Sequence, residues 1–180
     1  LVGNYNLINR QFKKLKLDQK VIQVKNLSDH SFSPNLKIID VPLNFKNPFK
    51  VSFKSASKYL IRSFRLANKL VKEKDVKGLI NCPIDKKLIE KTNKVGVTEF
   101  FASICKVVDK SEIMMIYNKS LSVVPLTTHI NIKDISKKIT KTLIIKKIKS
   151  LNKNFKKIFK KKPRIGVLGL NPHNGELRKN

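Results

Sequence analysis

The feature that most constrains the fold is an alternation of short apolar runs with longer stretches of helical spacing. Runs of strand character cover residues 21–24, 36–41, 77–82, 112–117, 121–124 and 164–168. Helices are expected over residues 55–72, 85–91, 97–104 and 146–164. The short connection 118–120 indicates a hairpin between two of the strands. The pattern therefore predicts the α/β class, with a mixed, mostly parallel sheet flanked by helices.

No internal repeat or low-complexity linker interrupts this alternation, so residues 1–180 contain no separate linker-bounded domain that we can recognise. No apolar run is long enough to span a bilayer, and we predict no membrane partner. Cys82 and Cys105 are too far apart for a CxxC motif, which excludes the common structural zinc pattern. We expect both to be small apolar side chains in a reducing cytosol.

The charge of the chain is strongly unbalanced, with 40 Lys and Arg against 12 Asp and Glu and a formal net charge of +28. Such an excess attracts phosphate backbones, which makes a basic nucleic-acid-binding module one candidate function. The lysines are, however, spread along the whole length together with asparagines and isoleucines. We therefore favour a general compositional bias over nucleic-acid binding.

The densest basic run, residues 146–164, reads as a cationic amphipathic helix that ends at Pro163. Its apolar residues recur at helical spacing: Ile139, Leu143, Ile144, Ile148, Leu151, Phe155, Ile158 and Phe159. Such a helix could bind a membrane surface or nucleic acid. Its position between two strand-like runs favours a crossover helix that buries one stripe and points its lysines at water.

Two histidines stand in short, unusual neighbourhoods: His129 in PLTTHI at 125–130 and His173 in GLNPHNGE at 169–176. Each follows an apolar run and is expected just past a strand's carboxyl end, where ligands gather in open α/β sheets. Imidazole is the commonest protein ligand for divalent transition metals, but a histidine at a strand end can also be purely structural. Both interpretations stay open on the residues alone. His30, in an expected polar loop, receives no role.

Two further motifs, GLINCPIDK at 78–86 and GVTEFFA at 96–102, precede the histidine motifs. Read in this order, the four motifs make the stretch 78–179 resemble the 4-hydroxythreonine-4-phosphate dehydrogenase family of pyridoxal phosphate synthesis. The resemblance implies a two-lobed architecture like that of isocitrate and isopropylmalate dehydrogenases, with a cleft between the lobes. It also implies a cytoplasmic homodimer.

The reaction implied by the resemblance is an NAD-dependent oxidation of 4-phosphooxy-L-threonine to 2-amino-3-oxo-4-phosphooxybutanoate, which decarboxylates to 3-amino-2-oxopropyl phosphate. His129 and His173 would be ligands of a divalent metal (zinc, magnesium or cobalt), and Thr98 would contact substrate. The metal would lower the pKa of the substrate alcohol and stabilise the enolate formed on decarboxylation. The chain contains no GxGxxG pattern, and we name no NAD-binding residue.

One position departs from the family pattern. Val97 stands where the family usually has a histidine that contacts substrate, directly before Thr98. A valine side chain neither donates nor accepts a hydrogen bond. The polar contact would therefore have to come from another side chain, such as a lysine, or the substrate would have to differ.

The chain starts at Leu1, and the family's Gly/Pro-rich amino-terminal loop and carboxyl-terminal half have no counterpart in it. We therefore expect an internal fragment of one two-lobed dehydrogenase. The third metal ligand would lie beyond Asn180, so the fragment alone is expected to be inactive. Two alternatives remain: the basic nucleic-acid-binding module, and a related dehydrogenase of another phosphorylated hydroxy acid.

Overall fold

A computed structural model of the chain describes residues 1–26, 33–73, 76–94, 96–107, 111–171 and 173. His30 lies outside the described residues. The chain divides into two compact units, Leu1–Val107 and Val108–Asn180. We call them the first and second units and describe each by itself.

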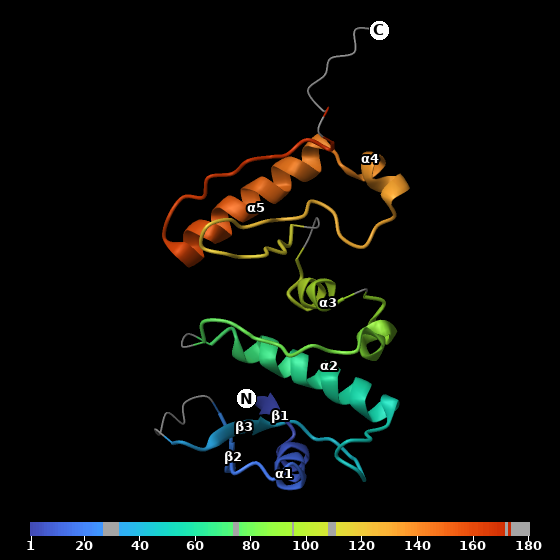
Figure 1. Ribbon diagram of the computed structural model, residues 1–180, viewed down its shortest axis with the longest axis vertical. Coiled ribbons are helices and arrows are strands. Elements are labelled where there is room, and N and C mark those ends of the chain that lie inside the picture. Colours follow the sequence, from blue (N-terminus) through green and yellow to red (C-terminus); the bar gives the residue numbers. More distant parts are fainter. Residues whose placement is uncertain (27–32, 74–75, 95, 108–110, 172, 174–180) are drawn as a thin grey trace. The chain divides into compact units, whose positions relative to one another are not determined.

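The first unit is built on a three-stranded parallel sheet (Figure 1). Its strands are β1 (Val2–Gly3), β2 (Val21–Val24) and β3 (Leu36–Asp40), in the order β1-β3-β2. Ile39 on the central strand pairs with Val2 on one side and with Val24 on the other. The predicted strands at 21–24 and 36–41 and the parallel pairing are thereby confirmed.

Two helices pack on this sheet, which lies between them in Figure 1. Helix α1 (Tyr5–Lys14) contacts β2 and β3, and helix α2 (Phe53–Leu70) contacts β1. The hydroxyl of Ser52 caps α2 by accepting a hydrogen bond from the Ser55 amide at 3.4 Å. The helix predicted over 55–72 is confirmed as α2, whereas α1 was not predicted.

The turn from β1 into α1 is fixed by a buried polar cluster. Asn4, only 3% exposed, caps α1 by accepting from the Leu7 amide at 2.8 Å and donates to the Val41 carbonyl at 2.9 Å. Asp40 accepts from the Tyr5 amide at 2.7 Å, and the Tyr59 hydroxyl accepts from the Asn4 amide at 2.9 Å. These bonds join β1, α1, the end of β3 and α2 at one point.

Two short helices cover the other side of α2: the 3₁₀-helix η1 (Lys86–Thr92) and helix α3 (Val97–Ile104). Both were predicted, over 85–91 and 97–104. Phe64 of α2 meets Phe100 and Phe101 of α3, with ring centroids 5.7 and 5.0 Å away. The buried hydrophobic residues of the described chain all lie in this unit: Val21, Ile38, Ile39, Val41, Phe64, Ala67, Ile89 and Phe100.

The second unit is dominated by helix α5 (Lys141–Phe159), which Thr140 caps by accepting from the Leu143 amide at 3.1 Å. Before it come the 3₁₀-helix η2 (Ile132–Asp134) and the single-turn helix α4 (Ile135–Lys138). Ile116 and Val123 form one antiparallel bridge, with N···O distances of 2.9 and 3.0 Å. This bridge confirms the predicted hairpin around 118–120.

Segment 111–117 is held to α5 by polar and aromatic contacts. The ammonium of Lys147, 9% exposed, donates to the Glu112 carbonyl and lies 3.8 Å from the Glu112 carboxylate. Ser150 donates to the Ser111 carbonyl at 2.7 Å. The ring of Tyr117 stacks on Phe159, with centroids 4.9 Å apart. Lys147 is the one buried residue among the described residues of this unit, so these contacts substitute for an apolar core.

Several strand predictions were wrong for the structure described. Residues 77–82 and 164–168 form no strand, and 112–117 and 121–124 contribute only the Ile116–Val123 bridge. Ile80 and Leu168, in the first two of these runs, are 98% and 92% exposed. A strand needs a hydrogen-bonded neighbour, and the described residues provide none for these runs. The expected positions of His129 and His173 directly after strands are wrong for the same reason.

Two smaller expectations were also corrected. The basic helix begins at Lys141 rather than 146 and ends at Phe159, before Pro163, because Lys160 adopts the left-handed conformation (φ 55°) that commonly terminates helices. Cys82 and Cys105 are exposed rather than packed in apolar surroundings.

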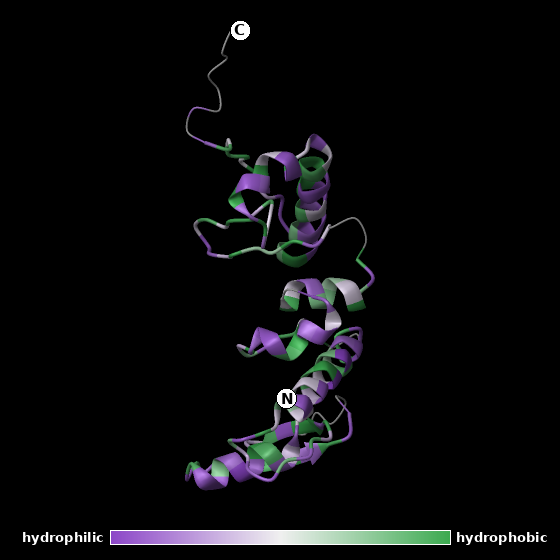
Figure 2. Cartoon of the chain, turned by 90° about the vertical axis from the view of Figure 1, so that its right-hand side faces the viewer, coloured by the Kyte–Doolittle hydropathy of each residue, from purple (hydrophilic) through white to green (hydrophobic). Residues whose placement is uncertain are grey.

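Figure 2 shows hydrophilic and hydrophobic residues mixed along α5, as expected for an amphipathic helix. None of the helices in the described ranges combines the length and the apolar character needed to cross a bilayer.

Candidate functional site

His129 has an unusual backbone conformation. Its φ is 54°, in the left-handed region that side chains with a Cβ adopt at a cost of roughly 1–2 kcal/mol. Four other described non-glycine residues share this region, and each of them follows a helix: Lys16, Asn93, Lys106 and Lys160. Helix ends adopt this conformation routinely. His129 is exposed and does not follow a helix, since it lies three residues before η2 begins at Ile132. Non-glycine residues held in this conformation cluster at functional positions.

His173 lies in a turn formed by its own motif. Its backbone amide donates to the side-chain oxygen of Asn171 at 3.0 Å, which is an Asx turn, and the residue is exposed. The Asn171 side chain therefore shapes the turn at His173. His129 and His173 belong to the same compact unit, on separate segments.

Thr98 lies in the first unit, in the first turn of α3, and is half-buried. Gly96, the N-cap of this helix, has no side chain with which to cap it, so Thr98 lies in the first turn of a helix that its N-cap residue leaves without a side-chain cap. Val97 opens the helix and is also half-buried. Glu99 follows, and its buried Oε2 accepts no hydrogen bond from the part of the chain that is described.

The two histidines are suitable ligands for a divalent metal, but two ligands are too few for a complete site. Two exposed imidazoles suit zinc or cobalt, yet a catalytic site normally has three protein ligands. Within the described ranges no group of three or more His, Cys, Asp or Glu side chains could hold a metal ion. His129 and His173 can therefore provide two ligands of a site and not a complete one.

Sequence reasoning missed a basic hollow on the first unit, lined by side chains of α1 and of the connection between β3 and α2. A signal was present in the spacing of Arg10, Lys13 and Lys14, which places three cations on one helix face. It was overlooked because α1 itself was not predicted.

Comparison with known proteins identifies the family. The family model described as pyridoxal phosphate biosynthetic protein PdxA matches residues 1–179. The chain belongs to this family. A 4-hydroxythreonine-4-phosphate dehydrogenase of Aquifex aeolicus is 37% identical over 145 residues, and one of Sulfurihydrogenibium sp. is 32% identical over 178 residues. These matches cover 79% and 96% of the chain but only 43% and 53% of the relatives, so the chain spans about half their length.

Solved structures agree with this assignment. The crystal structure of 4-hydroxythreonine-4-phosphate dehydrogenase from Klebsiella pneumoniae matches with a TM-score of 0.83 and 25% identity. The match covers 97% of this chain and 54% of that one. The corresponding enzyme from Burkholderia phymatum matches with a TM-score of 0.80, also at 25% identity. The resemblance stated from the four motifs and the α/β fold class are both confirmed.

Proposed function

We propose that this chain is part of a 4-hydroxythreonine-4-phosphate dehydrogenase. The reaction would oxidise the secondary alcohol of 4-phosphooxy-L-threonine to a ketone, with hydride passing to NAD and a proton being released. The product, 2-amino-3-oxo-4-phosphooxybutanoate, is a β-keto acid that loses CO₂ to give 3-amino-2-oxopropyl phosphate. The observation that supports this proposal most directly is the PdxA family match over residues 1–179.

His129 and His173 are proposed as two ligands of a divalent metal, zinc, magnesium or cobalt. The left-handed backbone of His129 supports this role, because non-glycine residues held in this conformation cluster at active sites and ligand-binding sites. The Asx turn at Asn171 likewise orients the chain at His173. When bound, the metal would act as a Lewis acid on the substrate's alcohol oxygen.

Thr98 is proposed to bind substrate from the first turn of α3. A hydroxyl there can donate to an anionic substrate group, and the uncapped amides of the same turn favour negative charge. Val97 adds no polar contact. The role that the family usually gives to a histidine at this position would fall to another side chain, or the substrate would differ.

The remaining properties are proposed on family membership. Both compact units would belong to one two-lobed dehydrogenase that works as a homodimer in the cytoplasm, with NAD as its redox cofactor. A relative from Oceanobacillus iheyensis, 27% identical, carries the provisional name D-threonate 4-phosphate dehydrogenase. A related phosphorylated hydroxy acid is therefore a second candidate substrate. Because Val97 removes a polar substrate contact, the binding of the two substrates should be compared.

Cobalt(II) titration of the purified chain tests the metal ligands, because the visible spectrum of the ion reports imidazole ligation. We expect binding to weaken at least about tenfold in His129→Ala and in His173→Ala, because loss of a residue that only supports a metal ligand already weakens binding about 10–100-fold. His30→Ala is the matched control and should bind as the parent chain does. Addition of 4-phosphooxy-L-threonine should change the cobalt spectrum of the parent chain.

Equal cobalt binding by all three histidine variants would contradict the proposed ligand pair. The nucleic-acid alternative is tested in parallel with a DNA duplex. It predicts steep loss of binding with salt and no effect of His129→Ala or His173→Ala. Metal binding that depends on both histidines would favour the dehydrogenase.

A further inference from the structure

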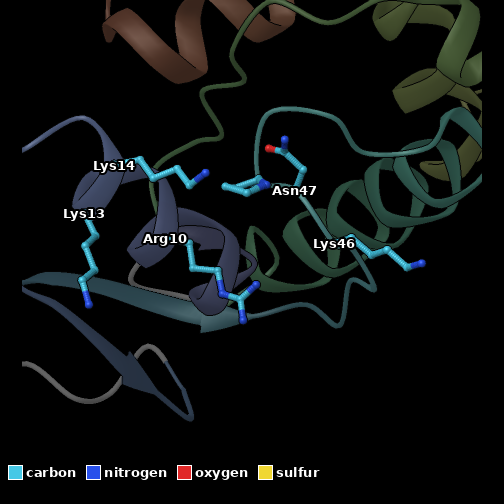
Figure 3. Close-up of a pocket in the computed structure, with 6 residues that line it drawn as sticks. Arg10, Lys13, Lys14, Lys46 and Asn47 are labelled. Carbon is cyan, nitrogen blue, oxygen red and sulfur yellow. The ribbon is translucent and has the colours of Figure 1, made fainter.

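The first unit carries a hollow of about 370 Å³, and four of its six lining residues are cationic (Figure 3). The lining residues are Arg10, Lys13, Lys14, Lys46, Asn47 and Pro48. We call this site the basic hollow. None of the residues proposed above for the dehydrogenase site lines it.

Two segments of the chain form the basic hollow, and direct contacts hold them together. Arg10, Lys13 and Lys14 lie on one face of α1, at spacings of three and four residues. Gln11 of the same helix donates to the carbonyl of the buried Pro48 at 2.8 Å, and the Arg10 guanidinium lies 5.5 Å from the centre of the Phe45 ring. The hollow is therefore fixed in place before any ligand arrives.

The positive charge of the hollow is not balanced by acidic side chains. No acidic residue lines it, and in the described ranges no carboxylate forms an ion pair with Arg10, Lys13, Lys14 or Lys46. Like charges at these helix spacings repel one another and destabilise the helix. An anion bound between them would relieve this repulsion.

Asn47 adds a neutral donor to the hollow. Its side-chain oxygen accepts from the Phe49 amide at 2.9 Å, which fixes the orientation of the group. The amide nitrogen makes no hydrogen bond to any described residue, so it can donate to a ligand.

The arrangement of the cations suits an extended anion better than a compact one. In Figure 3 the Lys14 side chain points toward Asn47, whereas the ends of Lys13 and Lys46 point to different sides. Because the ends of these side chains diverge, several linked phosphates suit them better than a single phosphate group. We propose that the basic hollow binds a short chain of linked phosphates, of the tripolyphosphate type.

Calorimetric titration of the full chain with tripolyphosphate at ~0.1 M salt tests this proposal. The site variant is Arg10→Gln/Lys13→Gln/Lys14→Gln. The control variant is Lys153→Gln/Lys156→Gln/Lys157→Gln, which removes three exposed charges at the same spacing from α5. Each variant lowers the formal net charge by three, from +28 to +25.

We expect the site variant to bind tripolyphosphate at least about tenfold more weakly than the parent chain, and the control to change by less than about twofold. The single variant Lys14→Gln should weaken binding about threefold, and circular dichroism checks that both α1 variants keep their helices. Equal losses in the site and control variants would mean that overall charge attracts the anion, which would overturn the proposal. Orthophosphate binding as tight as tripolyphosphate binding would also overturn it. So would binding of a DNA duplex that is weakened equally by the α1 variant and by the α5 variant.

Discussion

At the scale of single residues, Asn4 stabilises the first unit more than an ordinary helix cap does. Its one side chain accepts from the Leu7 amide and donates to the Val41 carbonyl in a buried setting. We expect Asn4→Ala to lower the free energy of unfolding by about 2–3 kcal/mol, from the lost cap and the unpaired buried carbonyl. Urea denaturation followed by circular dichroism measures this.

Ser52→Ala is the control for this experiment, because Ser52 caps α2 at an exposed site and should cost only about 0.5–1 kcal/mol. Equal losses of unfolding free energy in Asn4→Ala and Ser52→Ala would show that the buried contacts of Asn4 add no stability beyond helix capping.

Tyr59 should make the first unit sensitive to alkaline pH. Burial raises the pKa of its phenol above the ordinary value of 10.0. Because the pKa of Tyr59 is higher in the folded state than in the unfolded chain, its contribution to the free energy of unfolding is fully present below pH 10. This contribution is lost as the pH rises through the folded-state pKa. The stability advantage of the parent chain over Tyr59→Phe should therefore shrink between about pH 9 and pH 12, as measured by urea denaturation. An advantage that stays constant over this interval would refute the prediction.

The residue scale also marks a limit of sequence reasoning about the site. The motifs around His129 and His173 pointed to the family, because motif residues are adjacent in sequence. The left-handed backbone at His129 could not be predicted, since loop conformation depends on contacts outside the loop's own sequence. The neutral donor of Asn47 and the cations of α1 are likewise brought together only by folding.

At the scale of elements, helices were easier to predict than strands. Helix α2 follows from its own apolar stripe, which is local information, and the structure places it within two residues of the expected ends. The runs at 21–24 and 77–82 look equally strand-like in sequence, but among the described residues only the first has a hydrogen-bonded neighbour, β3. Pairing is a property of two segments, so no inspection of one segment can establish it.

Helix α5 offers a prediction at this scale. Lys147→Met removes the charged donor that holds segment 111–117, and a hydrogen bond from a charged group contributes about 1.5–3 kcal/mol. The amides of Ile116 and Val123 should then exchange hydrogen at least about tenfold faster, measured by mass spectrometry or NMR. Lys149→Met, an exposed neighbour on the same helix, should leave these rates unchanged. Unaltered hydrogen exchange at these two amides in Lys147→Met would show that the Tyr117–Phe159 stack and the Ser150 hydrogen bond are enough to hold segment 111–117 on α5.

At the scale of the whole molecule, the net charge of +28 should destabilise the folded chain through self-repulsion. Salt screens such repulsion, with a Debye length that falls from about 10 Å at 0.1 M to about 3 Å at 1 M. We therefore expect the thermal midpoint to rise by several degrees, about 2–4 °C for each 1 kcal/mol gained, when NaCl is raised. A midpoint that is independent of NaCl would mean that the charges are already too far apart to interact.

The strand order β1-β3-β2 has a consequence for synthesis on the ribosome. Of these three strands, β1 and β2 are made before β3, and they pair with β3 but not with each other. Asp40 and Val41, which secure the turn at Asn4, arrive at the same moment. This three-stranded sheet therefore cannot form until about residue 41 has left the exit tunnel, and both of its strand pairs and the hydrogen bonds that fix α1 can then form together.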